Sequence, residues 1–268
     1  MTELWLVDLD LAGPVLEALE HDAPRLAADD RARAYRLPDA CARRHRLRAY
    51  IALRIVLERA AGPRLRGARF VRGAGGKPRL AAGSIAFNLS HTGGLALIGV
   101  TTARAIGVDL ERTRPIAMSI RRREEILAVG AGLAGEPVGD ATSDAAVLRA
   151  WCRLEAFAKA QGRGLDAVLG DLGLRELGGR QLPPANINAA ARGLARTAGI
   201  RVGDVRLPPG LYGAIALGGA ARLPRVRNFP TDVPAILKLL SGGPAKARRR
   251  PPPQVRSTIV SPRRRSIR

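Results

Sequence analysis

The chain has 268 residues, of which 46% are apolar and only 3% aromatic, so its core must be built from aliphatic side chains. That length allows one large domain or two small ones. The net charge of +22 indicates a polyanionic substrate or partner. Neither a signal peptide nor an apolar run long enough to cross a bilayer is predicted, and the two cysteines are far apart. We therefore expect a soluble cytoplasmic protein that does not contact membranes.

The first part of the chain is expected to form helices and short strands. The pattern predicts a strand at 3–9, helical structure at 14–36 and a basic amphipathic helix at 43–61. After a glycine-rich turn, three β-type segments follow at 84–90, 95–102 and 105–111. Because two-residue turns separate them, we predict an antiparallel meander.

The second part begins with predicted helices at 119–129 and 144–161 and continues as short strands that close in a hairpin at 201–219. Residues 222–268 have thirteen Lys and Arg against a single acid, with many Pro, Ser and Gly. Such a composition buries too little apolar surface to fold alone. We expect a disordered basic tail with a transient helix at 233–240.

The segment GVDLE places two acids on one face of a strand. Side chains two residues apart in a strand project together, so Asp109 and Glu111 lie side by side while their neighbours point into a core. A pair of carboxylates suits a hard divalent cation such as Mg²⁺. The alternative is a strand edge whose acids face solvent.

The predicted helix at 144–161 has an apolar stripe that includes Trp151 and Leu154. Glu155 and Lys159 lie one turn apart on a neighbouring face, with the acid first, which is the favourable order. An ordinary surface ion pair would have the same spacing.

Two turns have groups that can bind phosphate. In FNLSHTGG, Ser90 and His91 precede a double glycine, where a hydroxyl, an imidazole and backbone N–H groups can hold anionic oxygens. In GGKP, Lys77 lies between two glycines and the φ-restricted Pro78. The alternatives are a capped turn with a surface histidine and a solvated lysine.

Taken in order, GGKP, FNLSHTGG, IGVDLE and WCRLEAFAKAQGRGL resemble the 4′-phosphopantetheinyl transferase superfamily. The likeness is greatest to its monomeric branch, typified by the enzyme that activates surfactin synthetase. The resemblance implies an α/β (α+β) fold of two similar halves with pseudo-two-fold symmetry. Residues 1–104 would form the coenzyme A-binding half and 105–221 the metal-binding catalytic half, followed by the basic tail at 222–268.

The resemblance also implies the activity. Such an enzyme transfers the 4′-phosphopantetheine moiety of coenzyme A to a serine of an apo acyl- or peptidyl-carrier protein, with Mg²⁺ as cofactor and 3′,5′-ADP as product. By position, the metal ligands would be Asp109, Glu111 and Glu155. Glu155 would help to deprotonate the carrier serine, and Lys159 would stabilise the diphosphate and the leaving group.

Coenzyme A would be held by residues at the matching positions of these motifs. They are Arg33, Arg46, Lys77, Pro78, Ser90, His91, Asp109 and Lys159, with Pro78 shaping the adenine-binding turn and His91 on the 3′-phosphate. The family usually has a lysine directly before the helix glutamate, where this chain has Leu154. That departure puts in doubt which group assists proton transfer, but it removes no metal ligand.

Partners follow from charge. The part of the chain before the tail is basic, which suits an acidic carrier protein and would mainly raise the rate of association. The two-half architecture permits a monomer. A different class, a nucleic-acid or polyanion-binding protein, is supported only by the arginine clusters of the tail, because the body has few aromatics to stack bases. A catalytically degenerate transferase homologue is a further alternative, suggested by Leu154. The sequence does not specify the carrier pathway, or Mg²⁺ over Mn²⁺.

Overall fold

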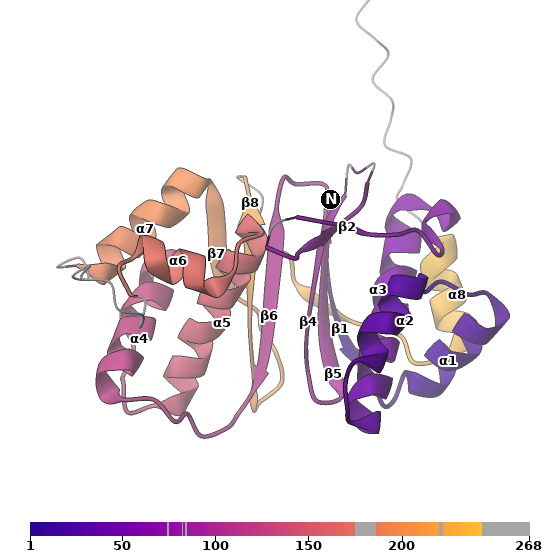
Figure 1. Cartoon of the computed structure of the whole chain (residues 1–268), viewed down its shortest axis with the longest axis horizontal. Helices are drawn as coiled ribbons and strands as arrows, with labels where there is room; N and C mark the ends of the chain where they lie inside the picture. The colour runs from indigo at the N-terminus through magenta and orange to yellow at the C-terminus, as the bar shows by residue number, and fades with distance from the viewer. Residues whose placement is uncertain (74, 82, 84, 175–185, 220–221, 243–268) are drawn as a thin grey trace, which may run out of the picture.

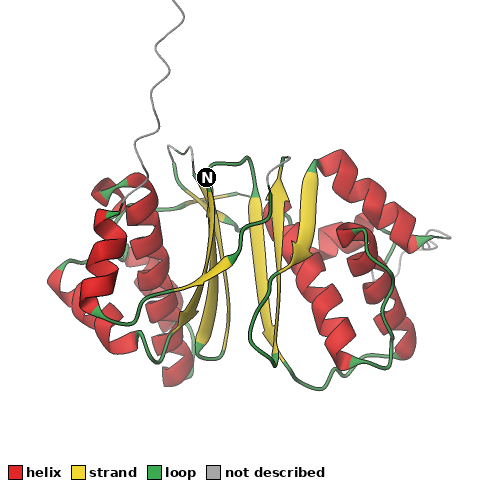
Figure 2. Cartoon of the chain, turned by 180° about the vertical axis from the view of Figure 1, so that it is seen from behind, coloured by secondary structure: helices red, strands yellow, loops and turns green. Residues whose placement is uncertain are grey.

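The computed structural model describes residues 1–73, 75–81, 83, 85–174, 186–219 and 222–242. Two β-sheets lie face to face in the middle of the molecule, and helices cover the outer face of each sheet (Figure 1). Figure 2 shows the same four layers from behind, with the strands between two groups of helices. None of the helices in these ranges is both long and apolar enough to cross a membrane.

The first sheet has the strand order β4-β5-β1-β9. Its strands are β1 (Thr2–Asp8), β4 (Ala86–Thr92), β5 (Leu95–Thr101) and β9 (Val226–Asn228). The helices on this side are α1 (Gly13–Asp22), α2 (Ala28–Tyr35), α3 (Ala40–Ala61) and α8 (Val233–Ser241), and the short elements are η1 (Pro63–Leu65), β2 (Val71–Arg72) and β3 (Pro78–Arg79). The predicted hairpin between the first two segments of the meander is confirmed, because β4 and β5 pair antiparallel.

The second sheet has the order β6-β8-β7, with both pairs antiparallel. Its strands are β6 (Ile106–Arg112), β7 (Ile200–Asp204) and β8 (Leu211–Gly218), and its helices are α4 (Ile120–Ala134), α5 (Asp144–Gln161), α6 (Leu165–Asp171) and α7 (Ile187–Ala198). The predicted helices and closing hairpin are confirmed. Two expectations are wrong: β6 pairs with β8 instead of β5, and α6 and α7 are helices where short strands were predicted.

An apolar layer joins the two sheets. It consists of Leu4, Leu6, Leu97, Ile106, Val108, Leu110, Ile215 and Leu217, all of them buried. Across this layer the Val108 N–H donates a hydrogen bond of 2.8 Å to the Asn88 side-chain oxygen, which ties β6 to β4. Each half also has its own core between sheet and helices. This packing and the hydrogen bond therefore fix the distance between β4 and β6.

Part of the predicted tail belongs to the fold. Residues 226–228 form β9, which pairs parallel with β1, and Asp232 caps the following helix α8 by accepting from Ala235 N. Phe229 and Ile236 are buried in the core of the first half. The expectation of disorder from residue 222 is wrong here because the segment docks its few apolar residues onto an existing core and needs none of its own. The expectation for residues 243–268 lies outside the described residues.

Candidate active site

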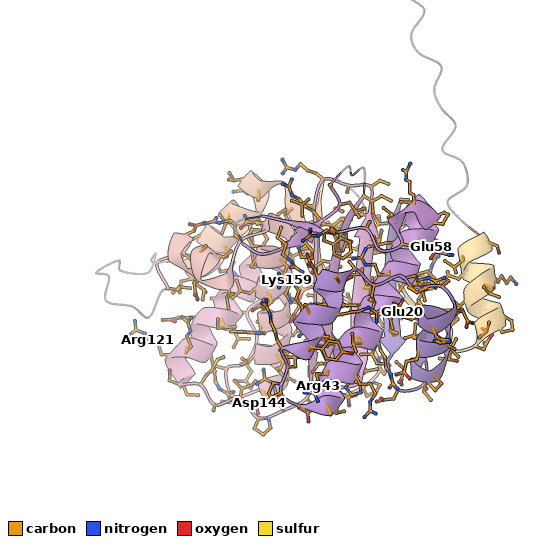
Figure 3. All side chains as sticks on the ribbon, turned by 45° about the vertical axis from the view of Figure 1, so that its right-hand side comes forward. Glu20, Arg43, Glu58, Arg121, Asp144 and Lys159 are labelled. Atoms are coloured by element: carbon orange, nitrogen blue, oxygen red, sulfur yellow. The ribbon has the colours of Figure 1, made fainter. Side chains whose placement is uncertain are left out.

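A pocket of about 350 Å³ lies where α3, β4, β6 and α5 meet; we call it the acidic pocket. It is lined by Arg46, Leu89, Ser90, His91, Thr92, Asp109, Leu110, Glu111, Trp151, Glu155 and Lys159. Seven of these residues belong to the set expected from the sequence: Arg46, Ser90, His91, Asp109, Glu111, Glu155 and Lys159. In Figure 3, Lys159 lies where the second half faces the helices of the first.

The approach of β6 to α5 depends on Gly107. A Cβ atom at this position would lie 2.0 Å from the Ala156 carbonyl oxygen and 2.5 Å from the Ala160 nitrogen. Both atoms belong to the helix backbone, which cannot move aside as a flexible side chain can. Glycine lets the strand approach the helix this closely, and Asp109, two residues further along β6, then faces the acidic side of α5.

Asp109 is the centre of the polar contacts. It is only 4% exposed, and its Oδ1 accepts from the Lys159 ammonium at 2.6 Å and from the Ser90 hydroxyl at 2.9 Å. Its Oδ2 is buried and has no hydrogen-bond partner among the described residues. A buried carboxylate oxygen without an N–H or O–H donor is costly, and the buried Cys152 thiol, a weak donor, interacts with this carboxylate.

Glu155 and Glu111 complete the acidic side of the pocket. The Glu155 Oε2 lies 3.9 Å from the Lys159 ammonium. Burial raises the pKa of Glu155, the charge of Lys159 opposes that change, and the charges of Asp109 and Glu111 reinforce it. Glu111 lies 3.5 Å from the Arg114 guanidinium. Lys159 thus occupies the position of a cation between two carboxylates.

His91 and Arg46 face the acids from the first half. Burial, together with the charges of Arg46, His45 and Lys159, lowers the pKa of His91 to about 4, so the ring is neutral at pH 7. The Arg46 Nε is buried and has no acceptor within the described part of the chain. An anion entering here would find a donor that lacks a partner and a ring that can take up a proton.

Lys77 and Pro78 line a second pocket of about 340 Å³, which we call the glutamine pocket after Gln161. The Lys77 ammonium donates to the Ile106 carbonyl oxygen at 2.5 Å, and burial lowers its pKa to about 8. In this structure, therefore, the lysine ties the GGKP turn to β6 and does not project freely from it. Arg33 lies exposed on α2 and lines neither pocket.

Leu154 is fully buried in the core of the second half, as its place in the apolar stripe predicted. Trp151, by contrast, is only partly buried and lines the acidic pocket, one turn before Glu155. The apolar spacing of the helix predicts Trp151 only as a member of the stripe. Its spacing of four residues from Glu155 was the signal that could have placed it beside the acids.

The carboxylates of the acidic pocket suit a metal ion in their chemistry but not in their present arrangement. As the side chains stand, no group of three His, Cys, Asp or Glu among the described residues could hold one. The chemistry nevertheless fits a hard divalent cation, because three carboxylates line one pocket and a buried Asp109 oxygen has no N–H or O–H donor among the described residues. The obstacle is the Lys159 ammonium on the other Asp109 oxygen. Binding of a cation therefore requires Lys159 to move.

The fold and the pocket define a mixed α/β protein with a polar site suited to a charged small molecule. No family model matches the chain. A curated relative, the 4′-phosphopantetheinyl transferase HetI of Nostoc sp. (strain PCC 7120), is 33% identical over 174 residues, which cover 60% of this chain and 69% of the relative. The chain therefore belongs to the 4′-phosphopantetheinyl transferase family.

Proposed function

We propose that this protein transfers the 4′-phosphopantetheine moiety of coenzyme A to a serine of an apo acyl- or peptidyl-carrier protein. The proposal is supported above all by the convergence of Asp109, Glu155 and Lys159, from a strand and a helix some 45 residues apart in the chain, in one pocket beside Ser90 and His91. The name of the relative agrees with it.

In the proposed reaction the carrier serine oxygen attacks the β-phosphorus of coenzyme A. A new P–O bond forms to the serine, the bond to the bridging oxygen breaks, and 3′,5′-ADP leaves. Glu155 accepts the serine proton directly or through a water, a role for which its raised pKa is suited. Lys159 moves from Asp109 to the diphosphate and stabilises the charge that develops on the leaving group.

Asp109, Glu111 and Glu155 are the residues that would hold Mg²⁺. When bound, the cation would offset the negative charge of the diphosphate oxygens. Ser90, which donates to Asp109, fixes that carboxylate in one orientation. His91 and Arg46 would bind phosphate oxygens from the opposite wall.

Other parts of the proposal concern the whole molecule. We infer that it belongs to the branch typified by the surfactin-synthetase-activating enzyme, with halves divided between residues 104 and 105 and related by a pseudo-two-fold axis. Support comes from the long helices, since α3 packs on β5 of one sheet and α5 on β6 and β8 of the other. We also propose that it acts as a cytoplasmic monomer on an acidic carrier.

The test is a transfer assay read by intact mass. The protein is incubated with coenzyme A, Mg²⁺ and an apo carrier protein, and the carrier is expected to gain one phosphopantetheine. A carrier whose acceptor serine is replaced by alanine serves as the control. Absence of transfer to fatty-acid, polyketide and nonribosomal-peptide carriers by a folded, coenzyme A-binding sample would refute the activity.

A further inference from the structure

The acidic pocket and the glutamine pocket lie end to end along the same three elements. The glutamine pocket is lined by Gly73, Lys77, Pro78, Arg79, Ala86, Phe87, Arg104, Ala105, Ala160, Gln161 and Gly162. On β4, residues 86–87 line the glutamine pocket and residues 89–92 line the acidic pocket. On and just before β6, residues 104–105 line the glutamine pocket and residues 109–111 line the acidic pocket. At the C-terminal end of α5, directly after Lys159, residues 160–162 line the glutamine pocket. The two pockets are therefore neighbours along the boundary between the halves, and we call the pair the trough.

The length of this trough suits a nucleotide. Three residues of strand separate Phe87 from Ser90, a distance of about 10 Å. Six residues of helix separate Glu155 from Gln161, a distance of about 9 Å. A ribose with its 5′-phosphate connects a base to a diphosphate over a span of this order, so a diphosphate beside Lys159 would place its base in the glutamine pocket.

The lining of the glutamine pocket also suits a base. Pro78, Ala86 and Ala105 line it with apolar groups, while Arg79 and Arg104 add positive charge. Its volume of about 340 Å³ lies at the small end of the range of ligand pockets, roughly 300–1,000 Å³. A flat apolar ring with a phosphate nearby fits this combination better than the uncharged pantetheine arm, which gains nothing from the cations.

Gln161 supplies the polar group that would recognise the base. It is the last residue of α5, directly before Gly162, which ends the helix in a left-handed conformation. Its side-chain Oε1 is buried and accepts no hydrogen bond from any residue that the structure describes. An acceptor buried without a donor costs free energy unless a ligand supplies the donor.

We propose that Gln161 is a specificity-determining residue that recognises the adenine base of coenzyme A, its Oε1 accepting a hydrogen bond from the adenine amino group. The side-chain amide can donate to a neighbouring ring nitrogen at the same time, which is the two-bond geometry by which glutamine selects adenine elsewhere. The inference depends on the proposed function only for the identity of the ligand.

The test compares coenzyme A with 1,N6-ethenocoenzyme A, in which a bridge replaces both hydrogens of the adenine amino group. Binding is measured by calorimetry without turnover, so a failure of the transfer activity leaves this test intact. The wild-type protein is expected to bind the etheno ligand about tenfold more weakly, as the loss of one hydrogen bond predicts. Equal binding of the two ligands by the wild-type protein would overturn the proposal, whatever happens in any variant.

Gln161→Met keeps the length of the side chain and removes its acceptor. This variant should bind coenzyme A about tenfold more weakly, bind the etheno ligand as the wild type does, and raise KM for coenzyme A with kcat nearly unchanged. Asn228→Leu, at an exposed amide on β9 outside both pockets, is the matched control. Equal weakening of both ligands by Gln161→Met would mean that the residue only shapes the pocket, and would overturn the proposal.

A third ligand separates the base from the pantetheine arm, which also has N–H donors. Free 3′,5′-ADP has the base and phosphates but no amide. If Gln161 binds adenine, Gln161→Met should weaken the binding of 3′,5′-ADP by the same factor as that of coenzyme A. Unchanged binding of 3′,5′-ADP would assign Gln161 to a pantetheine amide and overturn the adenine assignment.

Discussion

The two pockets of the trough share their walls but differ in chemistry. In the acidic pocket, charged groups face charged groups: Lys159 bridges Asp109 and Glu155, and Arg114 approaches Glu111. In the glutamine pocket, the half-buried Lys77 donates to a backbone carbonyl, and the Gln161 Oε1 has no donor among the described residues. In one pocket charge is balanced by charge, and in the other apolar residues surround a neutral amide.

Because the two pockets differ in this way, substitutions in them should affect different kinetic constants. Interactions that strengthen as charge develops in the transition state affect kcat, whereas uniform recognition of a remote part of the substrate affects KM. Changes in the acidic pocket should therefore slow turnover, and changes around Gln161 should weaken binding.

The largest effect is expected for Asp109→Asn. The substitution keeps the size of the side chain and removes the negative charge, so we expect kcat to fall by about 10²–10³-fold with the fold retained. Transfer assays and circular dichroism measure the two properties. Glu124→Gln, at an exposed acid on α4, is the control and should be neutral. A loss confined to KM would show that the acidic pocket only binds substrate.

Gly107→Ala should damage both pockets together, because it separates β6 from α5. The new methyl group would meet the helix backbone at 2.0 Å, and overpacking of this kind costs about 1–3 kcal/mol. Thermal unfolding should show a Tm lower by several degrees, and both kcat and KM should worsen. Gly193→Ala, where nothing lies within 4 Å in α7, should be neutral or stabilising. Equal Tm values for the two variants would contradict the close approach.

Lys159→Met should increase the affinity of the acidic pocket for a divalent cation. Because the ammonium binds the same carboxylate that a metal would need, its removal should raise the affinity for Mn²⁺ about tenfold in the absence of coenzyme A, while lowering kcat. Electron paramagnetic resonance counts free Mn²⁺. Lys159→Arg keeps the charge and should leave the affinity near that of the wild type. Unchanged Mn²⁺ binding in the methionine variant would count against competition for Asp109.

The smallest effect is a linked proton at His91. The pKa of this ring is about 4 in the free protein, and a bound phosphate would raise it. Binding of coenzyme A should then take up a fraction of a proton near pH 5–6, so that affinity rises as pH falls. Calorimetry in buffers of different ionisation enthalpy measures this uptake. His91→Gln should remove the contribution, whereas His21→Gln on α1 should not.

Local patterns predicted the elements that lie in the site. The two-residue period around Asp109 and the four-residue spacing of Glu155 and Lys159 correctly placed these groups on a strand face and a helix face. Which groups touch was not predictable, because Lys159 reaches Asp109 only through the tertiary approach at Gly107. The roles of these residues in catalysis stay predictions.

The errors have a common cause in partners that are distant in sequence. The short turn after β5 predicts that β6 continues a meander. Instead β6 pairs with β8, which lies about a hundred residues further along the chain. α7 is the exception, because its apolar residues gather on one face at helical spacing and its composition is rich in Ala, so the sequence did indicate this helix, which packs against α4. Phe229 and Ile236 are too few to predict a folded segment without knowledge of the core that receives them.

The parallel pairing of β9 with β1 has a consequence for biosynthesis. The ribosome makes β1 before, and β9 only after, every strand and helix of the second sheet. The first sheet therefore cannot gain its last strand, nor α3 its contact with α8, while the chain is half made. Although domains generally fold in order of synthesis, here the later half can acquire all its strands before the earlier one is finished. A nascent chain stalled at the point where residue 221 has just left the ribosomal exit tunnel should thus be protected from protease in the second half and still be cleavable in the first.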